Sequence, residues 1–475
     1  MPVQIKASLF FVLTGALKDA VDLISTPIFT RMLTTDEYGL FSVYNSWYQI
    51  IRIIVSLYIF SDGFNVGMAR FGDDKESFVS SQQGLMTVMF LFWVSVYLLY
   101  RTWWDRFFGM QSIFILLMLI QVMFTTAFNC WQNKKKYSYD YKSLTVVMFF
   151  YTILQPLMGI VLIRCNKHGF NNGELRIWSG VGVQIGFGLI VFILQFLKKP
   201  VFFRKPYWLF ALRTNITLVP HFMSQVLLNQ SDRLMIDAFI GKSETAIYSV
   251  AHAAAFTLYM VTANINSTFV PWFYEKLKKK DTVSVRQITC ILVILAAVAA
   301  MGLILVAPEV MRILAKADYY DGRWIIPPLT FSVYLIFIYT LFADVELFYG
   351  RNVYVLYSSI IGAASNIYLN YLMIPRYGYF AAGYTTVAGY LLMCMGHYLF
   401  LTITCRNEQV NMSEMFDIRI IISVTLAMAV FTACAMFLYR FMLIRYCILV
   451  VFMIIIIMNK SSLADLYNKL KSREG

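Results

Sequence analysis

Charged residues, histidines and paired cysteines are all scarce in this sequence. Charged residues make up only 14% of the 475 residues, 59% are hydrophobic, and the mean hydropathy is +0.65. The chain has four histidines and seven cysteines, and the cysteines show no paired CxxC spacing and no histidine partners of the metal-binding type. This composition excludes a soluble globular protein. It also predicts no metal and no cofactor, and we interpret the cysteines as packing residues.

Long polar segments are missing as well. No stretch outside the hydrophobic blocks exceeds about 20 residues, which leaves no room for an extramembrane domain of ordinary size. Membrane polymerases and lipid-using glycosyltransferases usually place their catalytic groups in a sizeable loop, and every loop expected here is short. The sequence therefore predicts that the protein is not an enzyme.

Hydrophobic stretches of about 20 residues recur from Leu9 to Met458. An α-helix of about 20 residues is long enough to cross a bilayer, so the sequence predicts an all-α polytopic membrane protein with about fourteen transmembrane helices. The expected helices are 8–32, 38–61, 82–100, 110–132, 143–164, 175–197, 212–240, 246–272, 287–307, 325–349, 353–374, 380–403, 418–439 and 442–459.

The net charge of +14 is distributed unevenly along the chain. Lysine and arginine gather in alternate loops, at Lys134–Lys142, Lys198–Lys205 and Lys276–Arg286, and in the tail Lys460–Arg473. This is the positive-inside pattern, and it predicts a multi-pass protein of the cytoplasmic (inner) membrane with both termini in the cytoplasm. The stretch 134–142, which mixes basic and aromatic residues between two spans, is expected to contact anionic lipid headgroups, and we expect no nucleic-acid partner.

Two segments recur along the chain at nearly the same offset. Leu33–Asn45 aligns with Ile240–His252, and Phe170–Gly173 aligns with Phe380–Gly383. Six expected spans separate the copies, so the halves have the same orientation and should enclose a cavity between them. The predicted organisation is an N-terminal six-helix lobe (1–197), a cytoplasmic linker (198–210), a C-terminal six-helix lobe (211–405), two additional helices (406–459) and a cytoplasmic tail (460–475).

Seven short motifs follow one another in a defined order. They are Thr26–Arg31, Asp36–Gly39, Ser231–Ile236, Ile247–Ala251, Asn366–Asn370, Ile374–Gly378 and Ala381–Gly383. In order and spacing they resemble the first, seventh, eighth, eleventh and twelfth spans of the polysaccharide-transport (Wzx-like flippase) family of the MOP exporter superfamily. The likeness extends from Leu9 to about Leu401, and the last two spans match only in hydrophobicity.

The resemblance implies two six-helix lobes in a V-shaped arrangement, two extra C-terminal helices and alternating access. Its implied cargo is an undecaprenyl-diphosphate-linked oligosaccharide, moved across the cytoplasmic membrane for O-antigen, capsule or similar surface polysaccharide. The implied partners are this lipid-linked substrate and membrane lipids, with H⁺ or Na⁺ as a coupling ion and a polysaccharide polymerase as further candidates. A lipid II flippase and a multidrug or cation antiporter of the same superfamily are the alternatives.

Charges inside the hydrophobic stretches are the candidate functional residues, because an ionisable group at membrane depth normally faces a partner or a water-filled cavity. A lipid diphosphate needs cationic donors, and Lys18 and Arg52 lie on adjacent expected spans. Lys18 and Asp22 are four residues apart and are alternatively expected to neutralise each other. Arg52 has no acidic residue within four positions, which favours a ligand or a partner on another helix.

The seventh expected span carries a third candidate cation, Arg233. We expect Arg233 to contact the substrate, and Asp232 and Asp237 to take part in coupling or gating; a structural ion pair is an equally good interpretation. Asp19 and Asp22 of the first span are further coupling candidates.

Asp344, Glu346 and the histidines are further candidates for the same role. The two acidic residues lie near the end of a span, so solvation is expected there. A histidine between helices is more often a packed polar residue than a titrating site. A cation antiporter should have an acidic cavity without central cations, which Lys18 and Arg52 argue against.

Overall fold

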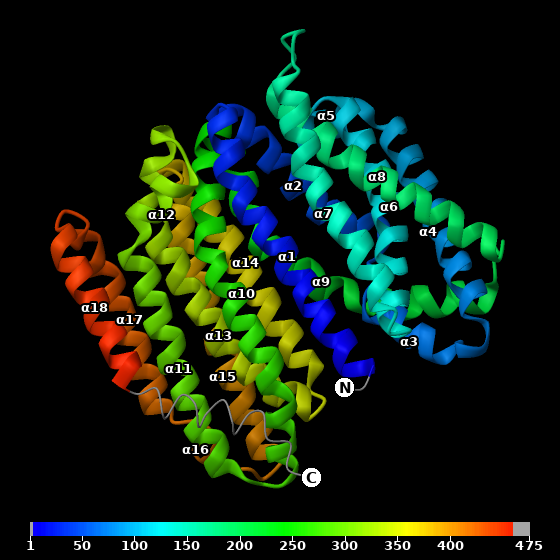
Figure 1. The fold of residues 1–475 in the computed structure, drawn as a ribbon. Coiled ribbons are helices and arrows are strands. Elements are labelled where there is room, and N and C mark those ends of the chain that lie inside the picture. Colours follow the sequence, from blue (N-terminus) through cyan, green and yellow to red (C-terminus); the bar gives the residue numbers. More distant parts are fainter. Residues whose placement is uncertain (1–2, 459–475) are drawn as a thin grey trace. The chain divides into compact units, whose positions relative to one another are not determined.

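The computed structural model describes residues 3–458, and the regular secondary structure of this part of the chain consists of helices, with two short 3-10 segments and no strand (Figure 1). Two compact units make up the chain, Met1–Asp237 and Ala238–Gly475. The predicted cytoplasmic tail 460–475 lies outside the described residues. The all-α prediction is confirmed for the described part.

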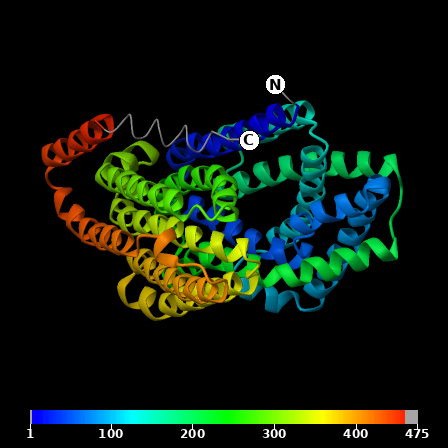
Figure 2. The same cartoon turned by 90° about the horizontal axis from the view of Figure 1, so that it is seen from below.

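The first unit is a bundle in which one helix contacts four others. α8 packs against α2, α4, α6 and α7, and α7 packs along α1 (Figures 1 and 2). The helices of this unit are α1 (Val3–Met32), α2 (Thr35–Ser56), α3 (Asp62–Arg70), η1 (Gly72–Asp74), α4 (Lys75–Leu99), α5 (Arg101–Phe108), α6 (Ser112–Tyr137), α7 (Tyr141–Arg164), α8 (Asn172–Lys198) and most of α9 (Lys205–Phe239).

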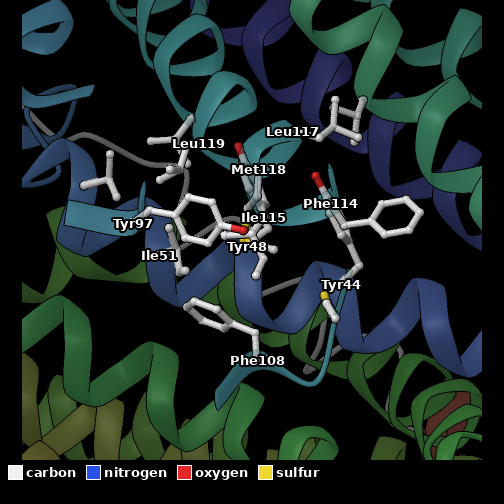
Figure 3. Packing of buried hydrophobic residues seen from close by; sticks show 14 of the residues in the cluster. Tyr44, Tyr48, Ile51, Tyr97, Phe108, Phe114, Ile115, Leu117, Met118 and Leu119 are labelled. Atoms are coloured by element: carbon white, nitrogen blue, oxygen red, sulfur yellow. The ribbon is translucent and has the colours of Figure 1, made fainter. Parts of the chain in front are cut away.

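A hydrophobic core joins α2 to α6 in this unit (Figure 3). Tyr44 and Tyr48 of α2 are buried against it together with Phe114 of α6. Their hydroxyl groups meet polar partners on α6, because a buried hydroxyl without a hydrogen bond is costly. Tyr44 donates to Gln121 at 2.8 Å, and Tyr48 lies 2.9 Å from the Thr125 hydroxyl. The α2–α6 contact is therefore apolar at its centre and hydrogen-bonded at its edge.

The second unit is built around α13 (Ile326–Phe348), which is buried along almost its whole length. A helix that is apolar on all sides is expected at the centre of a bundle. The surrounding helices are α10 (Lys242–Lys278), α11 (Thr282–Leu305), α12 (Ala307–Leu314), η2 (Ala317–Trp324), α14 (Asn352–Tyr377), α15 (Phe380–Asn407), α16 (Met412–Met415), α17 (Ile418–Leu438) and α18 (Met442–Met458). α17 and α18, orange to red, lie at the edge of this unit (Figure 2).

Each of the expected spans coincides with a helix, but not every helix is apolar. In residues 3–458, nine helices are long and apolar enough to cross a membrane: η1 with α4, α6, α7, α8, α10, α11, α13, α15 and α17. This confirms a multi-pass membrane protein. The expected fourteen exceed that number because α1, α2, α9 and α14 carry many polar side chains and the described apolar part of α18 is short.

The two segments that recur in sequence meet inside each unit. In the first unit, Glu37 at the start of α2 accepts a hydrogen bond from the Asn172 amide of α8 at 3.0 Å. Gly173 is required beside it, because an added Cβ would lie 2.5 Å from the Glu37 carbonyl oxygen. In the second unit, Glu244 of α10 interacts electrostatically with Tyr379, which immediately precedes α15. In both units, the beginnings of the two repeated segments therefore lie near each other.

Ion pairs fasten the segment between α8 and α9 to the start of α4. Residues 199–204 are irregular, so the connection is shorter than the expected linker 198–210. Lys199 pairs with Asp74 at 2.7 Å, and Lys198 pairs with Glu76 at 2.9 Å. Gly84 of α4 allows the same segment to approach closely, since a Cβ there would collide with a backbone carbonyl.

Helix α9 belongs to the first compact unit, whereas the sequence placed 211–240 with the second lobe. The reason is packing against α4: Trp208 donates to the Ser81 carbonyl at 2.8 Å, and Tyr207 is buried in a cluster with Phe78. The boundary between the two compact units therefore lies about one helix further along the chain than the expected linker.

Two helix hairpins have the same arrangement of an N-capping aspartate and a lysine that pairs with it. Asp140 caps α7 and Asp281 caps α11, each accepting a hydrogen bond from the backbone amide three residues later, at 3.4 and 3.2 Å. Lys135 and Lys276, five residues earlier, pair with these carboxylates at 2.5 and 2.9 Å. The lysine hydrogen bond holds the pKa of Asp140 and of Asp281 below its usual range. Both caps are therefore ionised at neutral pH.

We expect Asp281→Ala to lower the free energy of unfolding by about 1 kcal/mol, the usual cost of losing an N-cap. The measurement is the thermal unfolding midpoint of the purified protein. A carboxylate with a depressed pKa stabilises the fold above its unfolded-state pKa and loses that effect as the pH falls through the folded-state value. The difference between wild type and variant should therefore shrink in acid. Lys276→Met keeps the cap and should cost less; equal midpoints for Asp281→Ala and wild type at neutral pH would contradict the assignment.

Candidate functional site

A cavity of about 500 Å³ lies within the first unit, between α1, α2, α6, α7 and α8. Its wall is unusually polar for a membrane protein interior, with side-chain amides and tyrosines from four of these helices. Three cations, Lys18, Arg52 and Arg176, line it together with the carboxylate of Asp22. The lining side chains thus carry a formal excess of positive charge, which favours an anionic ligand.

Arg52, near the C-terminal end of α2, is surrounded by aromatic rings. Its guanidinium carbon lies 5.9 Å from the ring centre of Tyr48, 5.6 Å from that of Tyr58 and 5.4 Å from that of Phe60. The buried Nε has no hydrogen-bond partner, and no ion pair joins Arg52 to a side chain that the structure describes. Because a buried N–H donor without an acceptor is costly, an anion at this position would be stabilised.

Arg176 of α8 is a second cation of this kind, and the sequence did not single it out. Its guanidinium carbon stacks 4.0 Å from the ring centre of Phe29 on α1 and 4.8 Å from that of Phe41 on α2. One nitrogen donates to the Gln155 carbonyl at 3.4 Å, while the buried Nε has no partner. The expected span 175–197 put this residue at a helix end, where an arginine is common. Glu174 lies two residues before it, so the criterion that identified Arg52 did not identify Arg176.

Lys18 and Asp22 also line the cavity, but they pair with each other. Lys18 Nζ lies 3.1 Å from Asp22 Oδ2, and the two side chains are 51% and 64% exposed. The structure therefore shows the mutual neutralisation that helical spacing allowed. Asp19 is half-buried on the same helix and is not among the lining residues.

A chain of hydrogen bonds crosses the cavity wall through four helices. Tyr44 of α2 donates to Gln121 of α6, Gln121 donates to Gln184 of α8, and Gln184 donates to Gln155 of α7, each at 2.8 Å. Gln155 completes the chain by donating to the Tyr151 carbonyl at 3.0 Å. Each amide is thereby fixed by its neighbours, and the wall presents an ordered set of donors and acceptors.

The polar residues predicted on the seventh span do not line this cavity. Arg233 of α9 donates to the Asn229 carbonyl at 2.9 Å and to Gln230 Oε1 at 3.0 Å, and Ser46 of α2 donates to the same oxygen at 3.0 Å. Asp232 is only 1% exposed. Both Asp232 and Asp237 have interaction partners. Gln230 of α9 thus accepts hydrogen bonds both from Arg233 on its own helix and from Ser46 of α2.

The expectation that Asp344 and Glu346 are solvated is wrong. Asp344 is 5% exposed and Glu346 is 0% exposed, because α13 is the central helix of the second unit and its final turns remain covered by neighbouring helices. His397 of α15 is 0% exposed and contacts Glu346 at 3.0 Å. Among the described residues, no group of three or more His, Cys, Asp and Glu is placed to hold a metal ion.

No family model matches this sequence, and no curated protein matches it. Solved structures, however, match over most of its length. The lipid II flippase MurJ in an inward closed conformation is 15% identical, with a TM-score of 0.73 over 96% of this chain and 99% of that chain. A multidrug resistance MATE family transporter of the MOP superfamily, inward-facing, is 12% identical, with a TM-score of 0.55 over 85% of this chain and 98% of that chain. The chain has the MOP transporter fold.

A third MOP transporter also matches. It comes from Pyrococcus furiosus, its reported structure describes a binding pocket of reverse polarity that suggests a different function, and it is 12% identical with a TM-score of 0.53 over 86% of this chain and 96% of that chain. At these identities the likeness shows the fold alone. The MOP fold is shared by a flippase and by drug exporters, so the fold alone does not determine a function.

Proposed function

We propose that this protein is a flippase that moves an undecaprenyl-diphosphate-linked oligosaccharide across the cytoplasmic membrane by alternating access, for surface polysaccharide synthesis. The motif resemblance and the MOP fold both support a transporter of this type. We also propose that α1, α2, α9, α14 and α18 cross the membrane with the nine apolar helices, since their polar residues would be shielded within the protein.

The observation that carries the proposal is a pair of arginines without carboxylate partners on the wall of one polar cavity. Arg52 and Arg176 both have a buried Nε that lacks an acceptor. Guanidinium groups bind phosphate oxygens through two parallel hydrogen bonds, and a diphosphate has enough oxygens for both. Without such donors, taking the headgroup out of water would be prohibitively costly. We therefore assign the diphosphate to Arg52 and Arg176, with Lys18 as a third, already partly neutralised cation.

The glycan would contact the uncharged polar and aromatic side chains of the same cavity wall. Fixed glutamine amides and tyrosines offer alternating donors and acceptors to sugar hydroxyls, and tyrosine rings offer faces on which a sugar ring can pack. A cavity of about 500 Å³ holds a ligand of drug-like size, so it suits a headgroup portion and not a polyprenyl chain. We place the chain in the bilayer beside the protein.

A lipid II flippase has nearly the same requirements and is the second candidate, favoured by the TM-score of 0.73 with MurJ. A cation exporter is disfavoured, since it should bind its cargo with unpaired acidic groups. Asp22, which pairs with Lys18, is the acidic residue among the described lining side chains.

The test uses purified protein in nanodiscs and compares three probes: undecaprenyl diphosphate carrying a glycan, undecaprenyl monophosphate, and an organic cation. We expect the glycosylated diphosphate to raise the thermal unfolding midpoint most, because a ligand that binds only the folded state stabilises it. In proteoliposomes the same lipid should become accessible to a membrane-impermeant oxidant on the far side. Stabilisation by the organic cation alone would overturn the proposal in favour of an exporter.

A further inference from the structure

A carboxylate and an imidazole meet in the interior of the second unit, far along the chain from the cationic cavity. Glu346 of α13 and His397 of α15 are both 0% exposed. His397 Nδ1 lies 3.0 Å from Glu346 Oε2 and 3.2 Å from Oε1. The other ring nitrogen, Nε2, is buried and has no hydrogen-bond partner. Ionisable side chains are almost never fully buried unless they are paired, so this pair requires an explanation.

Aromatic rings fix the imidazole in place. Tyr339 of α13 stacks on His397 with ring centres 5.3 Å apart and an interplanar angle of 11°. Tyr390 stacks on Tyr339 in turn, at 6.2 Å and 6°. The imidazole therefore cannot turn its free nitrogen to another partner without disturbing this stack.

Few other titratable groups face the pair. Asp344 is buried on α13 but points elsewhere, towards Asn266 and Tyr274 of α10. Arg351, just after α13, pairs with Glu408 at 2.9 Å.

The helices around Glu346 and His397 place three uncharged groups near the pair: a thiol, a hydroxyl and a tyrosine. The charged residues of these helices lie towards the helix ends. The uncharged ones are Cys394 of α15, Ser358 of α14 and Tyr259 of α10. The charged ones on the elements that pack against α13 and α15 are Lys242, Glu244, Glu275, Lys276, Lys278, Arg286, Asp318, Asp321, Arg323, Arg376, Arg406, Glu414 and Arg419.

The proton count of the pair decides its charge. With a single proton between Nδ1 and the carboxylate, Glu346 and His397 together carry one negative charge in a low-dielectric interior. A second proton, either on Nε2 or on the carboxyl group, makes the pair neutral. Because burial penalises net charge, the interior favours the neutral pair, and any water that reaches it favours release of the proton. The pair is thus a site whose proton occupancy depends on access to water.

We propose that Glu346 and His397 form a proton-binding site that takes up one H⁺ and supplies the coupling ion of this transporter. The coupling role rests on the proposed flippase function, whereas proton binding does not. This assignment differs from the candidates on α1, where Lys18 and Asp22 pair with each other and are exposed.

Proton uptake by the purified full-length protein tests the site without any cargo. A pH-indicator dye counts the protons bound per molecule between about pH 5 and about pH 9, the range in which histidine and buried carboxyl groups titrate. Glu346→Gln should bind one proton fewer than wild type. His397→Gln should retain the proton and release it at higher pH, because the lone buried carboxylate loses the imidazole that stabilised it.

The matched control removes the other buried carboxyl group of the same helix. In an Asp344→Asn background, Glu346→Gln should again remove one proton. Equal proton uptake by wild type and Glu346→Gln, or an unchanged titration midpoint in His397→Gln, would overturn the site. Should Glu346→Gln fail to fold, the midpoint of His397→Gln decides the question alone.

Coupling is tested separately in proteoliposomes with and without an imposed pH gradient, using undecaprenyl diphosphate carrying a glycan as the probe. We expect the gradient to accelerate translocation by wild type and to leave Glu346→Gln unaffected. Translocation by wild type that ignores the gradient would overturn coupling. No translocation under any condition, together with normal proton uptake, would instead count against the flippase function and leave the proton site standing.

Discussion

Replacing Arg52 by alanine is expected to abolish translocation while leaving expression and folding intact. The side chain lines the polar cavity, and its Nε has no acceptor in the structure. Removing one partner of a buried, charge-assisted contact costs about 2–5 kcal/mol, which corresponds to about a 30-fold or greater loss of affinity. Arg52→Lys keeps the charge but loses the two-point grip on phosphate oxygens, so part of the activity should remain.

The measurement is complementation of a flippase-deficient strain, supported by binding of undecaprenyl diphosphate to the purified variants. Lys18→Ala provides the matched control, because this cation lines the same cavity but is already paired with Asp22 at 3.1 Å. It should lose less than Arg52→Ala does. Full transport by the Arg52→Ala protein would remove this residue from the site.

Helix positions were the part of the fold that hydropathy could predict, and the reason is local. A run of apolar residues needs only the bilayer to form a helix, so each expected span coincides with a helix whatever its neighbours are. Whether a span is apolar all round depends on what packs against it. α1 and α2 border the cavity, and their polar side chains face it in place of lipid.

Burial of individual charges was not predictable in the same way. Glu346 lies two residues from the end of α13, and distance from a helix end suggested solvation; the neighbouring helices extend past it and cover it. Its partner, His397, is 51 residues away in sequence, and no pattern along the chain links the two. Spacing on one helix did predict the Lys18–Asp22 pair, since both residues belong to the same face.

Arg176 shows how the two kinds of information combine. The sequence identified Arg52 from its lack of a nearby acid, whereas Glu174, two residues before Arg176, kept the same criterion from identifying Arg176. Only the structure places it on the same cavity, stacked against Phe29 and Phe41. With one arginine, the site would be a single cation near a phosphate. With two, we interpret it as a clamp in which Arg52 and Arg176 each bind one phosphate of the same diphosphate.

The clamp predicts a large effect for Arg176→Ala, comparable to that of Arg52→Ala, since each arginine would hold part of the same diphosphate. Arg164→Ala, at the exposed end of α7 and outside the cavity lining, is the matched control and should leave binding unchanged. Affinity for undecaprenyl diphosphate, measured for both single variants and for the Arg52→Ala/Arg176→Ala double variant, completes the test. If the two arginines grip one ligand, the double variant should lose less than the sum of the single losses, because residues that share a partner are not additive. Additive losses would mean that the arginines act independently, and wild-type affinity in Arg176→Ala would exclude this residue from the site.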